Sequence, residues 1–351
     1  MDSFDFDNTN CSLVENTFYE NSIPHFLYQF ASPLDWRTIQ VEEIANNKCY
    51  IDAKNIYIGN NLLKRHNPNE IFRNVHQRLN NNYFIAFKIV TAENVKSKLQ
   101  TILPHGLVKI YYPLHFFIRR VIPKIKGFRK ISRLLNLPID MSKSEIMGRL
   151  IYQGFNIISL HDNNEETIIV AKVNPAYNPS LIKAQPSEGI LFKMLRMGKN
   201  EEQITVYKLR SMHPYAEYVQ EYIYLNHGLD IGGKFKDDFR VSTGGKFIRK
   251  YWIDELPMII NLIKGDIKLI GVRPISQHYF NLYPASLKSL RVKTKPGLLP
   301  PFYADMPKTF EEIIQSELTY LKAYQNNPFR TDLEYFIKII KNIFINRVRS
   351  K

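Results

Sequence analysis

The sequence is poor in cysteine and in long apolar runs. Cys11 and Cys49 are its two cysteines, which excludes a disulfide framework and is typical of a reducing compartment. A membrane-spanning helix needs about 20 mostly apolar residues. The longest runs without Asp, Glu, Lys or Arg, such as 21–34, are shorter and are interrupted by His, Gln or Pro. We therefore expect no transmembrane helix.

Two further signals are missing from the amino-terminal part. Residues 1–20 are acidic and lack a basic start and an apolar stretch, so we expect no secretory signal and a cytosolic location. No glycine precedes Gly59, and hence no glycine-rich phosphate loop follows an early strand. We assign no nucleotide cofactor to this part.

Positive charge is abundant. The chain has 48 Lys and Arg against 33 Asp and Glu, a formal net charge of +15, which predicts an anionic partner: nucleic acid, a phospholipid surface or a phosphorylated small molecule. Between 109 and 133, basic residues occur without one acid. Apolar residues recur there at helical steps, with Pro123 placed to kink the helix; they are Ile110, Leu114, Phe117, Val121, Ile125 and Phe128.

Two interpretations of this basic amphipathic segment, 109–135, stay open. It is an interfacial helix drawn to anionic lipid, or it is a helix that joins domains, with the apolar stripe in the core and the charges in water. The composition alone does not choose between them.

The hydrophobic pattern divides the chain into two domains. Apolar, β-branched strands at 49–59 and 83–91 flank a helix at 69–79, which predicts an α/β domain over 1–173. Ser142 and Glu145 have capping-box spacing for a helix over 142–154. A hairpin of 155–160 and 166–173 follows around the turn cluster at 161–164.

A linker and a second domain follow. Residues 174–187 are rich in turn-forming residues, which places the linker there and the second domain at 188–351. Helices are expected at 310–324 and 333–345. The apolar face of the last helix lies beside lysines, so this helix either packs on the core or lies on a membrane.

Candidate chemistry concentrates between Gly189 and Pro300. Asp254 and Glu255 precede an apolar run, and the plainest interpretation is a helix start with Asp254 as its cap. Both carboxylates could instead reach one solvent pocket, where the helix terminus favours a phosphate. Arg249 and Arg273 could bind phosphate oxygens in a bidentate way; the alternative is an ordinary surface ion pair.

The order of these motifs resembles the bacterial sugar transferase family. These monotopic polyprenyl-phosphate sugar-1-phosphate transferases start envelope glycan assembly. The likeness covers most of 188–345 and rests on these segments in sequence: LFKMLRMGKN, VYKLRSM, DFR, GKFIRKYWIDELP, NLIKGDIKLIGVRP and KPG. It implies an α+β, helix-rich catalytic domain with membrane-associating amphipathic helices.

The resemblance also implies a reaction and its residues. Asp254 would attack the sugar-bearing phosphate of a UDP-sugar, and undecaprenyl phosphate would then take the sugar phosphate from the enzyme. Glu255 would coordinate Mg²⁺. The phosphates would be bound by Lys208, Arg210, Arg249, Arg273 and Lys295. The enzyme would work as a monotopic or peripheral protein on the cytoplasmic face of the inner membrane.

Several residues depart from the family pattern. Val272 and Lys295 replace the usual proline and arginine, Leu299-Pro300 replaces Thr-Gly, and 174–187 does not read as the usual re-entrant helix. An alternative is therefore a catalytically lapsed scaffold in a glycan-assembly complex. Nucleic-acid binding ranks low, because the motifs match no recognition module. The sugar, the glycan, the role of the first domain and any homo-oligomer stay open.

Overall fold

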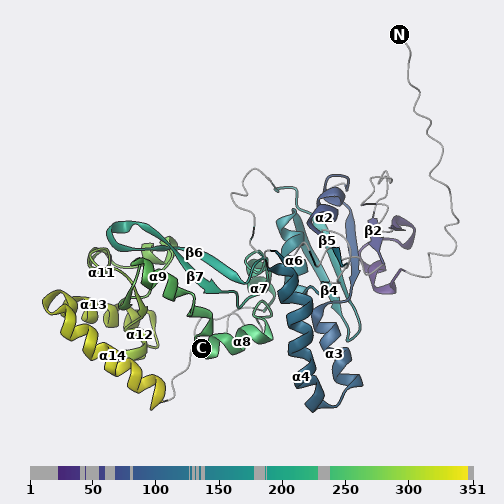
Figure 1. Cartoon of the computed structure of the whole chain (residues 1–351). Coiled ribbons are helices and arrows are strands. Elements are labelled where there is room, and N and C mark those ends of the chain that lie inside the picture. Colours follow the sequence, from purple (N-terminus) through teal and green to yellow (C-terminus); the bar gives the residue numbers. More distant parts are fainter. Residues whose placement is uncertain are drawn as a thin grey trace, which may run out of the picture. The chain divides into compact units, whose positions relative to one another are not determined.

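The chain forms two compact units in a computed structural model. The first contains residues 1–188 and 214–225, and the second 189–213 and 226–351 (Figure 1). Mixed α and β structure is present in both, as expected. The structure describes these residues: 23–39, 44, 55–59, 68–79, 82–125, 127–128, 131, 134–135, 139–177, 186, 188–227 and 238–346.

A five-stranded sheet forms the centre of the first unit. Its order is β1-β2-β3-β5-β4, in which β1, β2 and β3 are parallel and β5 and β4 pair antiparallel. The strands are β1 (Trp36–Thr38), β2 (Asn55–Ile58), β3 (Phe84–Ile89), β4 (Phe155–Asp162) and β5 (Thr167–Val173). The predicted hairpin is thus confirmed as β4 and β5. Residues 49–54 of the first expected strand lie outside the described residues.

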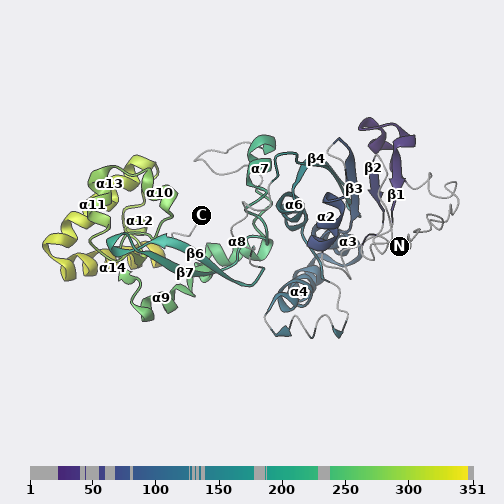
Figure 2. The ribbon, with the colours of Figure 1, turned by 90° about the horizontal axis from the view of Figure 1, so that it is seen from above.

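Helices complete this unit, and α2 and α6 lie side by side (Figures 1 and 2). Ser142 caps α6 by accepting from the Glu145 backbone N–H, as the capping-box spacing predicts. Ile71, Phe72 and Val75 of α2 are fully buried. The α-helices are α2 (Pro68–His76), α3 (Ala92–Ile102), α4 (His105–Phe116), α6 (Lys143–Tyr152) and α7 (Gln220–His227), and short 3-10 turns lie at His25–Gln29 and Pro33–Asp35.

A buried ion cluster joins α6 to the end of the basic segment. Glu145 is fully buried, and it accepts from Lys124 Nζ at 2.7 Å and Arg149 Nη2 at 2.9 Å. Burial alone would raise the pKa of Glu145, but Lys124 and Arg149 hold it well below its usual range. Burial lowers the pKa of Lys124 to about 8 against the attraction of Glu145. Lys124 and Arg149 thus neutralise a carboxylate in the interior of the unit.

The apolar residues of the basic segment face outward instead. After α4 the chain continues as a π-helical turn (Phe117–Val121) and a 3-10 turn (Ile122–Lys124). The α-helix therefore ends well before Pro123, which lies inside the 3-10 turn. Large apolar side chains on one side of α4 and the turn after it are exposed, Ile110 by 76%; this apolar face of α4 consists of Leu107, Ile110, Tyr111, Leu114, Phe117 and Ile118.

This arrangement decides one of the alternatives. A joining helix would keep Ile110 and Leu114 in the core and its charges in water. In the structure, Ile110 and Leu114 are exposed, Arg120 is buried, and the Lys124 side chain is only 9% exposed. The core position that this interpretation requires is wrong for Ile110, Leu114, Phe117 and Phe128, which are exposed, whereas Val121 and Ile125 are half-buried. Among the described residues, no helix has both the length and the apolar character needed to cross a bilayer.

The second unit combines two small ribbons with helices. β6 (Leu191–Met197) and β7 (Gln203–Leu209) form an antiparallel hairpin, and β8 (Lys268–Ile270) pairs in parallel with β9 (Gly297–Leu299) (Figure 1). The helices are α8 (Thr243–Lys250), α9 (Met258–Lys264), α10 (Gln277–Asn281), α11 (Ala285–Arg291), α12 (Phe302–Asp305), α13 (Phe310–Asn326) and α14 (Pro328–Phe344).

The last two helices form much of this unit's core. Thr309 caps α13, and Asn327 with Pro328 ends α13 and begins α14. The two helices predicted from the pattern are confirmed, each slightly longer than expected. Tyr320 and Ile339 are fully buried between them and their neighbours. Of the two roles left open for the last helix, α14 therefore has the first, since it packs on the core. The expected linker at 174–187 stays a prediction, because most of it lies outside the described residues.

We expect Gly148→Ala to destabilise the first unit. A Cβ at Gly148 would lie 2.2 Å from the Tyr215 backbone oxygen, so α6 or the 214–225 segment must shift, at a cost of about 1–3 kcal/mol. Gly106→Ala in α4 is the matched control, because a Cβ there has no atom within 4 Å and alanine favours a helix. Urea unfolding measures both. Equal midpoints for the two variants would contradict the close contact.

Candidate active site

Asp254 and Glu255 lie in a tight turn between two helices. The chain leaves α8, passes through Trp252 in the left-handed region (φ 55°), and forms a 3-10 turn over Ile253–Glu255. α9 begins only at Met258, with Pro257 as its cap residue. Asp254 as the helix cap is therefore wrong, because Pro257 occupies the cap position of α9 and no side chain caps this helix.

Trp252 carries backbone strain two residues before Asp254. A bulky residue in the left-handed region costs about 1–3 kcal/mol and persists when its surroundings hold it. The Trp252 ring packs edge-to-face against Tyr303 of α12, with centroids 5.5 Å apart. α12 thus helps hold the turn that carries Asp254.

Cations from three elements surround the acidic pair. Lys208 of β7 donates to Glu255 Oε1 at 2.6 Å, and Arg273 Nη2 lies 3.5 Å from the same oxygen. Arg249 of α8 is held by a hydrogen bond from its Nε to Ser211 Oγ at 2.7 Å. The Arg273 side chain is 55% exposed, so it can still turn toward a ligand.

The electrostatics favour a reactive carboxylate. Burial and the neighbouring Glu255 raise the pKa of Asp254, while Lys208 and Arg249 act in the opposite direction. Burial lowers the pKa of Arg249, whereas the negative charges of Asp254 and Asp238 act to raise it. Asp254 is therefore half-buried beside a like charge and near two cations, the type of environment found at functional carboxylates.

Two glycines hold the Arg273 loop. A Cβ at Gly297 would lie 2.1 Å from the Gly271 backbone nitrogen, so the two backbones touch where β8 and β9 pair. The Gly297 N–H donates to the Val272 carbonyl at 2.9 Å. Val272 itself is buried. The Gly-Val-Arg-Pro turn is thus fixed by the Lys-Pro-Gly segment that follows it in sequence.

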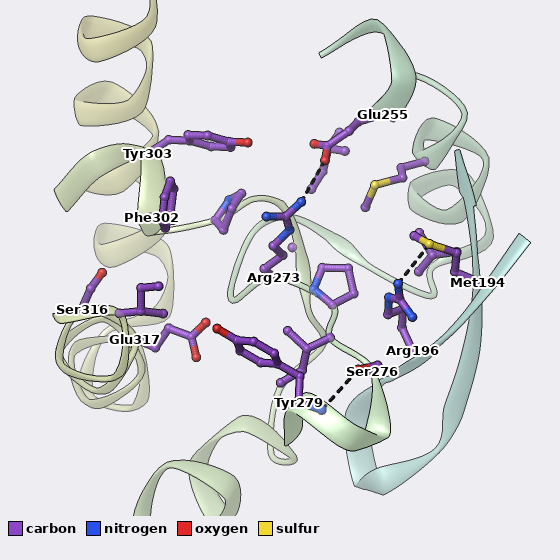
Figure 3. Close-up of a pocket in the computed structure, with 18 of the residues that line it drawn as sticks. Met194, Arg196, Glu255, Arg273, Ser276, Tyr279, Phe302, Tyr303, Ser316 and Glu317 are labelled. Atoms are coloured by element: carbon purple, nitrogen blue, oxygen red, sulfur yellow. Dashed lines mark hydrogen bonds and ion pairs between the residues drawn. The ribbon is translucent and has the colours of Figure 1, made fainter. Parts of the chain in front are cut away.

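A cavity of about 320 Å³ opens beside this cluster. In Figure 3, Arg273 reaches from its loop toward Glu255, and Phe302 and Tyr303 stand on another wall. The lining residues come from the β6–β7 hairpin, the 3-10 turn that contains Glu255, α9, the β8 and β9 loops, and α10, α12 and α13.

The expected site residues fall into three groups: those that line the cavity, those that do not line it but affect each other's pKa, and those whose contacts are elsewhere. Lys208, Glu255 and Arg273 line the cavity. Asp254 and Arg249 do not line it, but each contributes to the pKa of the other.

Arg210 and Lys295 lie apart from the cavity lining. Arg210 donates from Nε to the Gly189 carbonyl at 2.9 Å and stacks over Phe192. The Lys295 ammonium lies 3.5 Å from where a Cβ of Gly265 would be, at the end of α9. Their phosphate-binding role stays a prediction.

Sequence reasoning missed much of the cavity wall. Tyr279, Phe302, Tyr303 and Glu317 line it but lie outside the motifs that carried the resemblance. Arg196 lies inside one motif and also lines the cavity. The one available signal was the departure at Leu299-Pro300, which Pro301 separates from Phe302.

Comparison with known proteins identifies the family. A profile described as "Bacterial sugar transferase" matches residues 167–346, just over half of the chain. The chain belongs to this family.

Named relatives match shorter stretches. The galactosyl transferase CpsE of Streptococcus agalactiae is 34% identical over 139 residues, 38% of this chain and 30% of CpsE. A UDP-glucose:undecaprenyl-phosphate glucose-1-phosphate transferase of Caulobacter vibrioides is 30% identical over 179 residues, 48% of this chain and 63% of the relative. An N-acetylgalactosaminephosphotransferase of Aeromonas hydrophila, which uses UDP-N-acetylgalactosamine and undecaprenyl phosphate by its name, is 39% identical over 94 residues, 27% of this chain and 20% of the relative. The chain thus spans less than two thirds of the length of these relatives.

We expect Lys208→Met to raise the pKa of Asp254 further. The substitution removes a positive charge that favours the ionised carboxylate, while burial and Glu255 continue to favour the protonated form. Carbon NMR of labelled aspartate carboxyls during a pH titration measures the change, with Asp254→Asn assigning the signal.

The matched control is Lys193→Met, an exposed lysine on the neighbouring strand β6. It should leave the pKa of Asp254 unchanged. A pKa that falls in Lys208→Met, or that moves equally in both variants, would mean that Lys208 does not act on Asp254.

Proposed function

We propose that this protein transfers a sugar 1-phosphate from a UDP-sugar to a polyprenyl phosphate, through a covalent intermediate on Asp254. The observation that carries the proposal is the half-buried Asp254 beside Glu255, Lys208 and Arg249, in a chain of the sugar transferase family. Relatives whose names state transfer of glucose 1-phosphate to undecaprenyl phosphate support the substrates.

The chemistry consists of two displacements at one phosphorus atom. A carboxylate oxygen of Asp254 bonds to the sugar-bearing phosphorus, and the bond from that phosphorus to the oxygen of UMP breaks, so UMP leaves with the electron pair. A phosphate oxygen of the polyprenyl phosphate then bonds to the same phosphorus and the bond to Asp254 breaks. The carboxylate is restored, and the product is a polyprenyl diphosphate sugar.

The cations around the acidic pair suit both steps. Arg273 is exposed enough to bind phosphate oxygens in a bidentate way, and Lys208 adds a point charge from β7. Charge-assisted contacts of this kind stabilise the oxygens on which negative charge develops. Lys208 and Arg249 also favour the ionised, nucleophilic form of Asp254.

Glu255 is the residue that would hold Mg²⁺. The described residues contain no group of three His, Cys, Asp or Glu that could enclose an ion. The single carboxylate of Glu255 fits Mg²⁺, which commonly takes one or two carboxylates and completes its shell with substrate phosphates and water. When bound, the ion supplies neutralisation of the charge on the diphosphate.

Membrane attachment is proposed through two exposed apolar surfaces. The first is the apolar face of α4, which carries the exposed Lys109. The second follows the acidic pair on and before α9, where Ile263 is 81% exposed; it consists of Leu256, Ile259, Ile260 and Ile263. Apolar surface beside basic residues suits the interface of a bilayer with anionic lipid. We place the protein on the cytoplasmic face of the inner membrane, as a monotopic or peripheral protein.

Asp254→Asn should reduce UMP release from UDP-sugars by at least about a thousandfold, because the amide cannot form the covalent bond. The assay contains the full chain, Mg²⁺, polyprenyl phosphate and a panel of UDP-sugars. Glu334→Gln, at an exposed position of α14, is the control and should retain full activity. Full activity in Asp254→Asn would remove the proposed nucleophile. No release by the unaltered chain with any donor would favour the scaffold alternative.

Replacing Ile110 and Leu114 together by serine should weaken binding to anionic liposomes by at least about tenfold, since two exposed apolar side chains no longer insert. Co-sedimentation measures the bound fraction. The matched control replaces Leu333 and Ile337, which are exposed on α14, and should bind as before. Undiminished binding of the α4 variant would show that this face is not a membrane surface.

A further inference from the structure

One end of the cavity is aromatic, and the proposed chemistry leaves it without a role. Phe302 and Tyr303 from α12 and Tyr279 from α10 line this end. In Figure 3, Phe302 and Tyr303 lie to the left of Arg273, the Tyr303 hydroxyl points toward Glu255, and Tyr279 extends toward Glu317. We call the part of the cavity lined by Glu255, Lys208 and Arg273 its charged end, and the part lined by Phe302, Tyr303 and Tyr279 its aromatic end.

The local sequence explains how the rings reach the cavity. β9 ends at Leu299, and Pro300 and Pro301 turn the chain into the short helix α12. Tyr303 is buried and packs against Trp252, so its position is fixed. Phe302 packs edge-to-face on Tyr303, with centroids 5.6 Å apart, and is only partly buried. Phe302 is thus a supported ring with surface left for a ligand.

The charged end determines which part of a donor enters the aromatic end. Glu255, Lys208 and Arg273 line the cavity, whereas Asp254, one residue earlier, does not. In phosphoryl transfer the attacking and leaving oxygens lie roughly in line through phosphorus. A phosphorus atom held at the Arg273 end, with Asp254 outside the cavity, therefore directs the leaving nucleotide into it.

We infer that the aromatic end binds the planar base of the leaving nucleotide, with Phe302 as the stacking residue. This inference rests on the proposed function, and it assigns a specificity-determining role to a residue outside the shared motifs. A base presents a flat face that stacks on an aromatic side chain, which is worth about 1–3 kcal/mol per base. A hexose has no planar aromatic face and contacts a ring only through its C–H groups. The hydroxyl group of Tyr279 at the same end offers a hydrogen-bond partner at the edge of the base, whereas Glu317 is buried and paired with Arg291.

The test measures binding without turnover, in the full chain carrying Asp254→Asn. Calorimetry compares UMP with ribose 5-phosphate, which shares the sugar and phosphate but lacks the base. Adding Phe302→Leu should weaken UMP binding between about five- and a hundredfold and change ribose 5-phosphate binding by less than about twofold. Phe302→Tyr, which keeps a ring, should restore UMP binding. Phe329→Leu on α14, where Phe329 is 82% exposed, is the matched control and should leave both ligands unaffected.

A second measurement needs no cavity variant. Dihydrouridine monophosphate has a puckered, non-aromatic base, so it should bind the Asp254→Asn chain more weakly than UMP does. Equal affinity for the two nucleotides, or equal weakening of UMP and ribose 5-phosphate by Phe302→Leu, would overturn the stacking role. Weakened glucose 1-phosphate with unchanged UMP would assign this end to the sugar instead. Failure of the Asp254 mechanism is separate, because it appears as UMP release that persists in Asp254→Asn.

Discussion

The candidate site depends on the charge balance around one pair of carboxylates. Lys208 donates to Glu255 and Arg273 approaches it, while burial and Glu255 raise the pKa of the half-buried Asp254 against the opposing charges of Lys208 and Arg249. Without these cations, two adjacent carboxylates removed from water would repel each other. β7, the loop after β8 and the turn before α9 each supply one member of the cluster, so the cluster forms only where these three elements meet.

Backbone contacts make this convergence possible. The touching backbones of Gly271 and Gly297 place the Arg273 loop against β9, and the same strand leads through Pro300 and Pro301 into α12. Tyr303 of α12 then supports the strained Trp252. β9 therefore connects the Arg273 loop, against which it packs, to the helix that carries Phe302.

Local patterns predicted the secondary structure better than they predicted orientation. The cap at Ser142, the β4–β5 hairpin and the helices α13 and α14 follow from hydrogen bonds and periodicities within a few residues. The basic segment was ambiguous because periodicity shows that apolar residues share a face and does not show what covers that face. Glu145, which pairs with Lys124 from twenty-one residues away, is fully buried, whereas Ile110 is exposed.

By itself, the sequence determined the family, the acidic pair and those helices and strands that have a clear local pattern, such as α6, β4, β5, α13 and α14, because each is encoded in contiguous residues or in the order of short motifs. Only the tertiary structure decided which expected cations meet that pair and that Arg210 and Lys295 lie away from the cavity lining. It also showed that Tyr279, Phe302 and Glu317 share one cavity. The physical reason is that a binding site is formed by side chains distant in sequence, and their approach depends on packing and buried charge that no local pattern records.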